Sequence, residues 1–433
     1  MTKDISHSVG SKVLDAPLAS PPATLDEAMA EVRASVERFC LRAGIEVLQE
    51  MMEKDAAAIC GARHRRHRDR RGYRWGTCAS EIGYHGGRAK VRRPRVRDRA
   101  GREVGLGSWQ ALRDGDLLLE WALNLMVLNV STRKYRRAVR LPEGDLAAAP
   151  GDGTSKSAVS RRFVALSRKR MRDWLNADLS GLDLLVIQID GLHVGDHVLV
   201  SAIGVDGTGD KHVLAVVEGA TENTATVQAL LDNLTERGLD PTLPRLFIVD
   251  GAKALSRAIR NTFGIAAAIQ RCQIHKGRNI IERLPEHMHA SVRKALRQAW
   301  DQDDAEKAER QLKNLARRLE QVEPGVAGSI LEGLDEVLTV IRLGLPPELR
   351  RSLACTNIIE NALGTVRRVT RNVKRWRSAE MALRWTAAGM LEASKTFRRL
   401  KAYRQLPILR KALEDHMRRA KAGSALETIM QAA

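Results

Sequence analysis

Hydrophobic residues recur every three or four positions from Thr24 to about Ile59, and this spacing predicts amphipathic helices. The pattern is interrupted near Ala43 and Gly44, so we expect two helices with a break between them. Such a unit could serve in dimerisation or DNA binding, or it could be a helical cap on the next domain. The pattern alone leaves both interpretations open.

Residues 61–105 contain many Arg and Gly residues and have little helical periodicity. Alternating positions between Ala89 and Val96 predict a small β-hairpin or meander whose exposed edge carries Arg. Its aromatic residues Tyr73, Trp75 and Tyr84 could stack on bases. We expect instead that at least two of them form the core of this small unit.

Four potential metal ligands lie in or beside the same segment, namely Cys60, His64, His67 and Cys78. Zinc fingers use closely paired ligands, and these four lack that spacing. A zinc site is therefore not expected here.

Helical spacing returns from Asp114, and a turn at 129–132 precedes a second basic segment. This order predicts a helix-turn-helix whose second helix presents Arg133, Lys134, Arg136 and Arg137. After a linker rich in Gly and Pro, Thr154 or Ser155 can cap another helix carrying Lys156, Arg161 and Arg162. Basic and short polar residues at a helix start suit a DNA major groove, so the two segments together predict DNA binding.

Two apolar runs each lead into an Asp-Gly pair. Residues 184–189 read LLVIQI before Asp190, and residues 246–249 read LFIV before Asp250. Such runs predict strands that are buried on both faces. The whole segment predicts three antiparallel strands, a helix, a strand, a helix and a fifth short strand, which is the order of an RNase H-like α/β fold with a mixed five-stranded sheet. Because the first strand is central there and the fourth lies beside it, Asp190 and Asp250 should be neighbours.

Paired carboxylates at a sheet edge are the ligands that hard divalent cations prefer. Two Mg²⁺ or Mn²⁺ ions held in this way would support phosphoryl transfer between nucleic-acid strands. Asp-Gly after a strand is also ordinary turn chemistry, and either copy alone would be read as a turn. The pair on neighbouring strands favours a metal site, with His193 as a possible support or an ordinary loop residue. Candidates for a third acid are Glu282, Asp301, Asp303, Asp304 and Glu360.

Beyond Cys272 the chain has helical spacing almost to its end, punctuated by proline pairs and Pro-Gly. We expect an all-α insertion that interrupts the α/β core, and Thr356 capping the helix that carries Glu360. The predicted organisation is a flexible leader at 1–23, a helical unit at 24–60, a basic β-rich DNA-binding element at 61–105, a helix-turn-helix region at 106–180, the first part of the core at 181–284, the insertion at 285–350, and the second part of the core with a basic helical C-terminal region at 351–433.

The net charge of +20 is concentrated in two blocks. Residues 63–102 hold fourteen Arg and one Lys against three acidic residues, and residues 350–401 hold thirteen basic residues against three acidic ones. Local positive charge at this level indicates nucleic-acid binding more than an anionic membrane, because no basic amphipathic helix with an aromatic face is evident. In the hairpin the candidate contacts are Arg92, Arg93, Arg95 and Arg97, and in the C-terminal block Arg367, Arg368, Arg371, Lys374 and Arg375.

Five scattered cysteines in a long chain indicate a reducing compartment. No apolar run reaches the roughly 18 residues of a membrane span. These features predict a soluble intracellular protein that is not associated with membranes.

The motifs around both Asp-Gly pairs resemble those of the bacterial Mutator-like insertion-sequence transposases. The resemblance covers about Asp114 to Trp376 and is strongest from Asp190 to His275; it includes DGLHVGDHVLVSAIGVDG, FIVDGAKALSRAI, RCQIHKGRNI and TNIIENALGTVRR. It implies a DDE triad of Asp190, Asp250 and Glu360, and it selects Glu360 among the candidate third acids. The family's Cys-x-x-His is matched by Cys272 and His275, which we interpret as support beside the active site. The run Ala362-Leu363-Gly364 departs from the polar, Arg-rich sequence that often follows the Glu in this family.

The resemblance implies metal-dependent DNA cleavage at terminal inverted repeats, followed by attack of the freed 3′-hydroxyl on target DNA. Since two ends must be paired, the reaction implies a homodimer or a larger homo-oligomer on DNA. Two alternatives remain: an RNase H-like nuclease or resolvase that cuts without joining, and a non-catalytic DNA-binding protein derived from a transposase. The second would be expected to lack one of the triad acids, and all three are present.

Overall fold

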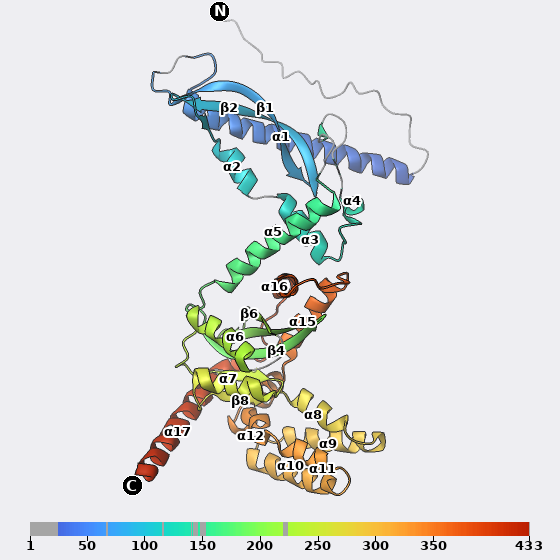
Figure 1. Ribbon diagram of the computed structural model, residues 1–433, viewed down its shortest axis with the longest axis vertical. Coiled ribbons are helices and arrows are strands. Elements are labelled where there is room, and N and C mark those ends of the chain that lie inside the picture. The colour runs from blue at the N-terminus through green and yellow to red at the C-terminus, as the bar shows by residue number, and fades with distance from the viewer. Residues whose placement is uncertain are drawn as a thin grey trace, which may run out of the picture. The chain divides into compact units, whose positions relative to one another are not determined.

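A computed structural model describes residues 25–65, 68–114, 117–139, 141, 146–147, 153–219 and 224–432 (Figure 1). The predicted leader, His67 and most of the Gly- and Pro-rich linker lie outside these residues. The chain forms two compact units, one from residues 1–118 with 139–154 and the other from residues 119–138 with 155–433. Each unit is described by itself.

The N-terminal unit is built on one long helix, α1 (Leu25–Cys60), where two helices were predicted. The break expected at Gly44 does not occur, because Leu41, Ile45, Leu48 and Met52 continue a buried stripe through that position. An isolated Gly within a helix costs only about 1 kcal/mol relative to Ala, which this packing outweighs.

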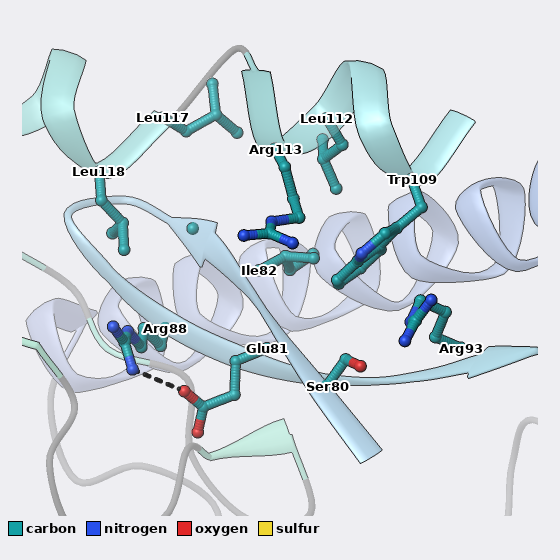
Figure 2. A pocket seen from close by; sticks show the side chains of 11 residues that line it. Ser80, Glu81, Ile82, Arg88, Arg93, Trp109, Leu112, Arg113, Leu117 and Leu118 are labelled. Carbon is teal, nitrogen blue, oxygen red and sulfur yellow. Dashed lines mark hydrogen bonds and ion pairs between the residues drawn. The ribbon is translucent and has the colours of Figure 1, made fainter. Parts of the chain in front are cut away.

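The predicted hairpin is confirmed and packs against α1. Strands β1 (Gly72–Tyr84) and β2 (Gly87–Asp98) pair antiparallel, and the short β3 (Glu103–Val104) extends the sheet. Ala89, Val91 and Val96 of β2 lie in one hydrophobic cluster with the buried stripe of α1. The following helix, α2 (Gly107–Asp114), borders a pocket over the hairpin (Figure 2).

Of the three hairpin aromatics, only Tyr84 packs against this cluster, so the expectation that at least two form the core is wrong. Trp75 is 48% exposed, and the Arg97 guanidinium lies 4.2 Å from its ring centroid. Tyr73 contacts the edge of Trp75, with ring centroids 5.9 Å apart. The two therefore form a small aromatic pair outside the core.

We predict that Gly44→Ala raises the free energy of unfolding by about 0.5–1 kcal/mol, because Ala is the better helix former. A Cβ at this position would meet nothing within 4 Å. Urea denaturation measures the change. The same substitution at Gly389 in α16 (Ala379–Ser394) is the control and should destabilise, since its Cβ would lie 2.9 Å from Cα of Val366. No gain at Gly44 would argue against one continuous α1.

The structure does not confirm the predicted helix-turn-helix. Helix α3 (Leu117–Val127) forms as expected, but the basic second segment gives only the four-residue turn α4 (Tyr135–Ala138). Tyr135 is fully buried and fixes this turn, while Arg133 and Lys134 precede it. Helix α5 (Lys156–Leu175) follows, and its predicted cap is confirmed: the Ser155 hydroxyl accepts a hydrogen bond of 3.3 Å from the Ala158 amide.

The second unit contains the predicted mixed five-stranded sheet. Its strands are β4 (Leu184–Val194), β5 (His197–Asp206), β6 (Lys211–Gly219), β7 (Leu246–Val249) and β8 (Ala268–Arg271), in the order β6-β5-β4-β7-β8. The meander β4–β5–β6 is antiparallel, and β7 and β8 run parallel to β4. The sheet therefore places β4 centrally with β7 beside it, as predicted.

Helices cover both faces of this sheet. Helices α6 (Thr224–Glu236) and α7 (Lys253–Phe263) share one hydrophobic cluster with Ile187 and Phe247. On the other face, α15 (Asn357–Thr370) and α16 cluster with Leu192 and Leu199. The strands are consequently buried on both sides, which explains their almost continuous apolar sequence.

The segment between the sheet and α15 is helical, as predicted. It contains α8 (Gln273–Ile281), η2 (Glu286–Met288), α9 (His289–Trp300), α10 (Ala305–Glu320), α11 (Pro324–Leu331), α12 (Leu334–Val337), α13 (Thr339–Arg342) and α14 (Pro347–Leu353). The buried Gln270 of β8 ties it to the sheet: its side chain donates to the Val337 carbonyl and accepts from the Val340 amide, both at 2.9 Å. The chain ends with η3 (Tyr403–Gln405) and α17 (Leu406–Ala432).

Candidate active site

The carboxylates of the two Asp-Gly pairs leave neighbouring strands at the same edge of the sheet. Strands β4 and β7 are parallel with Ile189 opposite Val249, so Asp190 and Asp250 follow the last paired residues. Strand β4 was predicted to end at Asp190. It continues instead to Val194, because β5 pairs with it beyond the end of β7. Asp190 is thus held within a strand, whereas Asp250 lies in the turn after one.

Asp190 is a buried acid among other acids. Burial, followed by the charge of Asp250, raises its pKa from 3.8 to about 7, and Glu360 adds to this. The Gly191 amide, which donates to Asp190 at 2.9 Å, and the neighbouring His275 act in the opposite direction. The side chain is 8% exposed. The site therefore concentrates negative charge that the protein itself neutralises only in part.

Glu360 reaches the site from the first turn of α15. Thr356 occupies the N-cap position, as predicted. Its hydroxyl, however, accepts no hydrogen bond from a backbone amide of the helix. It donates instead to Glu360 Oε1 at 2.8 Å and lies 3.4 Å from Cys272 Sγ. Thr356 thereby fixes the carboxylate of Glu360 and does not cap the helix with its side chain.

Gln188 is a positioning residue that the sequence reasoning missed. It is fully buried on β4, two residues before Asp190 and on the same face. Its amide donates to the Cys355 carbonyl and its oxygen accepts from the Ile359 amide, both at 3.1 Å. These bonds hold the start of α15, and with it Glu360, against the strand. A single polar residue inside an otherwise apolar buried run was the available signal.

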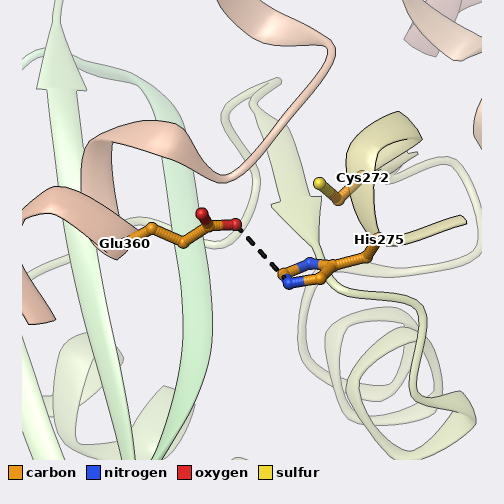
Figure 3. A group of neighbouring side chains, drawn as sticks. All are labelled: Cys272, His275 and Glu360. Atoms are coloured by element: carbon orange, nitrogen blue, oxygen red, sulfur yellow. Dashed lines mark ion pairs between the residues drawn. The ribbon is translucent and has the colours of Figure 1, made fainter. Parts of the chain in front are cut away.

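Cys272, His275 and Glu360 form a group of neighbouring side chains (Figure 3). Their ligand atoms all lie within 4.8 Å of one another, and His275 Nε2 is 3.5 Å from Glu360 Oε1. Cys272 raises the pKa of His275 to about 9 against the effect of burial, and Glu360 and Asp190 act in the same direction. Burial raises the pKa of Cys272, but His275 and Thr356 outweigh it and lower the value. The cluster places a positive imidazolium beside the acidic site.

Arg271 is wedged between two glycines, one of which directly follows Asp250. An added Cβ would lie 1.9 Å from Arg271 Nε at Gly251 and 2.8 Å from Arg271 NH1 at Gly333. Both glycines have positive φ, 105° and 62°. The guanidinium is 8% exposed and donates to the Glu332 carbonyl at 3.3 Å. It therefore links the Asp250 turn to the helical segment that contains Gly333.

We predict that Gly251→Ala lowers the free energy of unfolding by roughly 2–4 kcal/mol, through strain at positive φ and displacement of Arg271. Gly264→Ala is the matched control, because Gly264 also has positive φ, 83°, but a Cβ there meets nothing within 4 Å. Urea denaturation should show that Gly264→Ala lowers the free energy of unfolding by only about 1 kcal/mol. Equal losses for the two variants would mean that contact with Arg271 does not hold the turn.

The other candidate residues lie elsewhere. His193 is exposed and, three positions beyond Asp190 on β4, its side chain alternates to the opposite face. Among the alternative third acids, Glu282, Asp301, Asp303 and Asp304 are all exposed. Asp304 caps α10, and Asp303 pairs with Arg350. The structure therefore brings Asp190, Asp250 and Glu360 together and leaves the other candidates out.

The basic residues predicted to contact DNA differ in their exposure to solvent and in their ion pairs. In the hairpin, Arg92 is exposed, while Arg93 and Arg95 pair with Glu103 at 3.3 and 2.7 Å, and Arg97 covers Trp75. Arg162 is half-buried. The remaining predicted contacts are exposed in the second unit: Arg133, Lys134, Arg136, Arg137, Lys156, Arg161, Arg367, Arg368, Arg371, Lys374 and Arg375.

The donor atoms at this edge fit a hard divalent cation. Three carboxylates supply oxygen ligands, and the raised pKa of Asp190 reflects charge that a cation would neutralise. Cys272 and His275 would suit zinc, but with Glu360 they provide three ligands where a structural zinc site takes four. In the part of the chain described, the three acids do not form a group as tight as Cys272, His275 and Glu360.

Residues 24–399 match the profile of the family described as Transposase, Mutator family. The chain is 30% identical over 230 residues to a transposase for insertion sequence element IS6120 from Mycolicibacterium smegmatis, covering 52% of this chain and 69% of that protein. It is 24% identical over 379 residues to a transposase for ISRM5 from Rhizobium meliloti, covering 86% and 92%. It is 28% identical to a transposase for IS256 in transposon Tn4001 from Staphylococcus aureus, covering 58% and 63%. Among the described residues, no helix has the length and apolarity needed to cross a bilayer.

Proposed function

The chain belongs to the Mutator family of transposases, and we propose that it is the DDE transposase of an insertion sequence. In this proposal it binds the element's terminal inverted repeats, cleaves the DNA strands with divalent metal ions and transfers the freed ends to target DNA. The observation that carries the proposal is the convergence of Asp190, Asp250 and Glu360 beside a buried, charge-rich sheet edge.

The strand order supports an RNase H-like core. A three-strand antiparallel meander with two further parallel strands, in the order β6-β5-β4-β7-β8, delivers the first and fourth strands side by side. Open α/β sheets place their chemistry at the carboxyl edge of such strands. The Asp-Gly pairs lie there, which is a location that turn chemistry alone does not require.

The three acids act together in the proposal. Asp190, which is central and buried, would hold two Mg²⁺ or Mn²⁺ ions together with Asp250 and Glu360. When bound, the ions activate the attacking oxygen and neutralise the charge on the phosphate. Thr356 and Gln188 position Glu360, and His275 offsets negative charge in the protein without metal.

DNA binding is assigned to the basic surfaces. The exposed residues of α4, α5 and the segment around Arg367 to Arg375 lie in the same unit as the acids, where they can contact phosphates close to the site. The hairpin of the N-terminal unit carries a second basic block. Two bound ends require at least two copies of the chain, so we propose a homodimer or larger assembly on DNA.

The test is a cleavage and strand-transfer assay with Mg²⁺ or Mn²⁺ on DNA that carries the element's ends. We predict that Glu360→Gln lowers cleavage more than about tenfold, because a metal ligand is lost. Glu282→Gln, the same change at an exposed acid at the end of α8, should leave cleavage within about twofold.

The products of the same assay separate the alternatives. Cleavage followed by joining supports a transposase, whereas cleavage without joining under both metals supports a nuclease or resolvase. DNA binding without cleavage by the wild-type protein would support a non-catalytic binding protein. If Glu282→Gln is the inactive variant, the assignment of the third acid is wrong.

A further inference from the structure

A pocket of about 500 Å³ lies in the N-terminal unit between the hairpin and α2 (Figure 2). Its volume is within the range of about 300–1,000 Å³ that sites for small ligands occupy. Trp109, Leu112 and Arg113 enter it from α2, and Ile82 faces them from β1. The pocket is distant in sequence from the acids, and the proposed chemistry does not use it.

The lining of the pocket is strongly basic. Among the described residues it contains Arg88, Arg93 and Arg113 against a single carboxylate, Glu81, which pairs with Arg88 at 3.0 Å. Nε of Arg93 is buried without a hydrogen-bond partner, although its NH2 pairs with Glu103 at 3.3 Å. Arg113 is exposed and pairs with no carboxylate among the described residues. Arg113 therefore keeps its guanidinium donors for an anion, and Arg93 adds a second positive charge at the pocket.

The same pocket offers a flat apolar surface. Trp109 is half-buried, and the Arg93 guanidinium lies 5.6 Å from its ring centroid. Ile82 and Leu112 are half-buried and also face the cavity. An aromatic ring with apolar neighbours and adjacent guanidinium groups matches the two parts of a nucleotide, a planar base and a phosphate.

We propose that this pocket binds one unstacked nucleotide of DNA, with its base against Trp109 and its phosphate at Arg113 and Arg93. The inference rests on the proposed DNA-binding function and makes it more specific. A base within a duplex is covered by its neighbours and cannot enter a cavity, so the pocket selects a nucleotide outside the stack. Lys90 and Arg92 are exposed on β2, beyond the pocket lining, and can hold the adjoining duplex by its phosphates.

The experiment compares two DNA duplexes with the full-length protein. Both carry an end of the element; one is fully paired and the other has a single unpaired 2-aminopurine nucleotide. We expect the wild-type protein to bind the second duplex about tenfold more tightly and to quench 2-aminopurine fluorescence, because stacking of one base has an effect of this size.

Two variants assign the preference to the pocket. Arg113→Ala, at an exposed position that leaves the core untouched, should remove most of the tenfold preference, and Trp109→Leu should remove both preference and quenching. Trp109→Phe should keep both, since Phe also stacks. Arg33→Ala, at an exposed position on α1 outside the pocket, is the matched control and should bind as the wild type does.

The outcomes separate this inference from the function on which it rests. Equal affinity of the wild-type protein for the two duplexes, or a preference that survives Arg113→Ala, overturns the pocket assignment while leaving DNA binding intact. Failure of the wild-type protein to bind either duplex overturns the proposed DNA-binding function, and the pocket assignment with it.

Discussion

Asp190→Asn is expected to reduce DNA cleavage by at least about 10³-fold while leaving DNA affinity within about twofold of the wild type. Asn keeps the shape of the side chain but cannot supply a negatively charged ligand to two cations. The basic surfaces that would bind DNA are untouched by the change. Cleavage rates and fluorescence anisotropy on the same end-containing DNA measure the two effects.

Asp196→Asn is the matched control for this prediction. Asp196 is an exposed acid in the turn directly after β4, so the substitution removes one negative charge near the same strand without touching the site. Its cleavage rate should stay within about twofold of the wild type. If Asp190→Asn retained wild-type cleavage, Asp190 would be an ordinary turn residue and not a metal ligand.

Asp190→Asn should also stabilise the metal-free protein. Asp190 has its pKa raised from 3.8 to about 7, so its carboxylate form is disfavoured in the folded state. The contribution of Asp190 to the free energy of unfolding is therefore most favourable below about pH 3.8, where the side chain is protonated, and it is lost as the pH rises from there to about 7. Asn carries no such charge, and Asp190→Asn should raise the free energy of unfolding at pH 8 by on the order of 2–4 kcal/mol.

Urea denaturation in EDTA at two pH values tests whether Asp190→Asn stabilises the protein and whether the gain increases with pH. The advantage of Asp190→Asn over the wild type should be about 2 kcal/mol larger at pH 8 than at pH 5. Added Mn²⁺ should stabilise the wild type but not the variant, because a ligand that binds only the folded state raises the free energy of unfolding with the logarithm of its concentration divided by its dissociation constant. A variant that is less stable than the wild type at both pH values would show that the Asp190 carboxylate is well compensated without metal.

Predictions from the sequence were most accurate where hydrophobic burial determines the structure. The apolar runs before Asp190 and Asp250 were predicted to be buried strands, and the comparison with an RNase H-like fold predicted that they are neighbours, which the observed strand order confirms. The hairpin was likewise evident from its alternation. These features can be predicted because they depend on the pattern of apolar residues within short stretches of sequence and on the burial of apolar strand faces.

Predictions from the sequence were less accurate where partners distant in sequence decide the outcome. Gly44 predicts a break in isolation, but the hairpin buries the stripe on both sides of it and keeps α1 continuous. The basic segment at 133–140 was expected to form the second helix of a helix-turn-helix, but its described residues, 133–139, contain only the four-residue α4, around the buried Tyr135.

The supporting residues of the site were also hidden from the sequence. The roles of Gln188 and Arg271 depend on α15 and on Gly333, which lie 60 or more residues away in the chain. Thr356 was recognised as a capping residue, yet its hydroxyl serves Glu360, because that carboxylate lies one turn further along the same helix. The acids themselves could be selected, since a family motif marks them, but the motif does not reveal the hydrogen bonds and contacts of Gln188 and Arg271 that hold them.

The most direct test of metal ligation by the acids is DNA cleavage by Asp190→Cys in Mg²⁺ and in Mn²⁺. A thiolate binds Mg²⁺ poorly and softer cations better, so exchanging the metal probes the ligand itself. We predict almost no cleavage by Asp190→Cys in Mg²⁺ and partial recovery in Mn²⁺, with Glu282→Cys active in both. Wild-type cleavage by Asp190→Cys in Mg²⁺ would contradict this prediction.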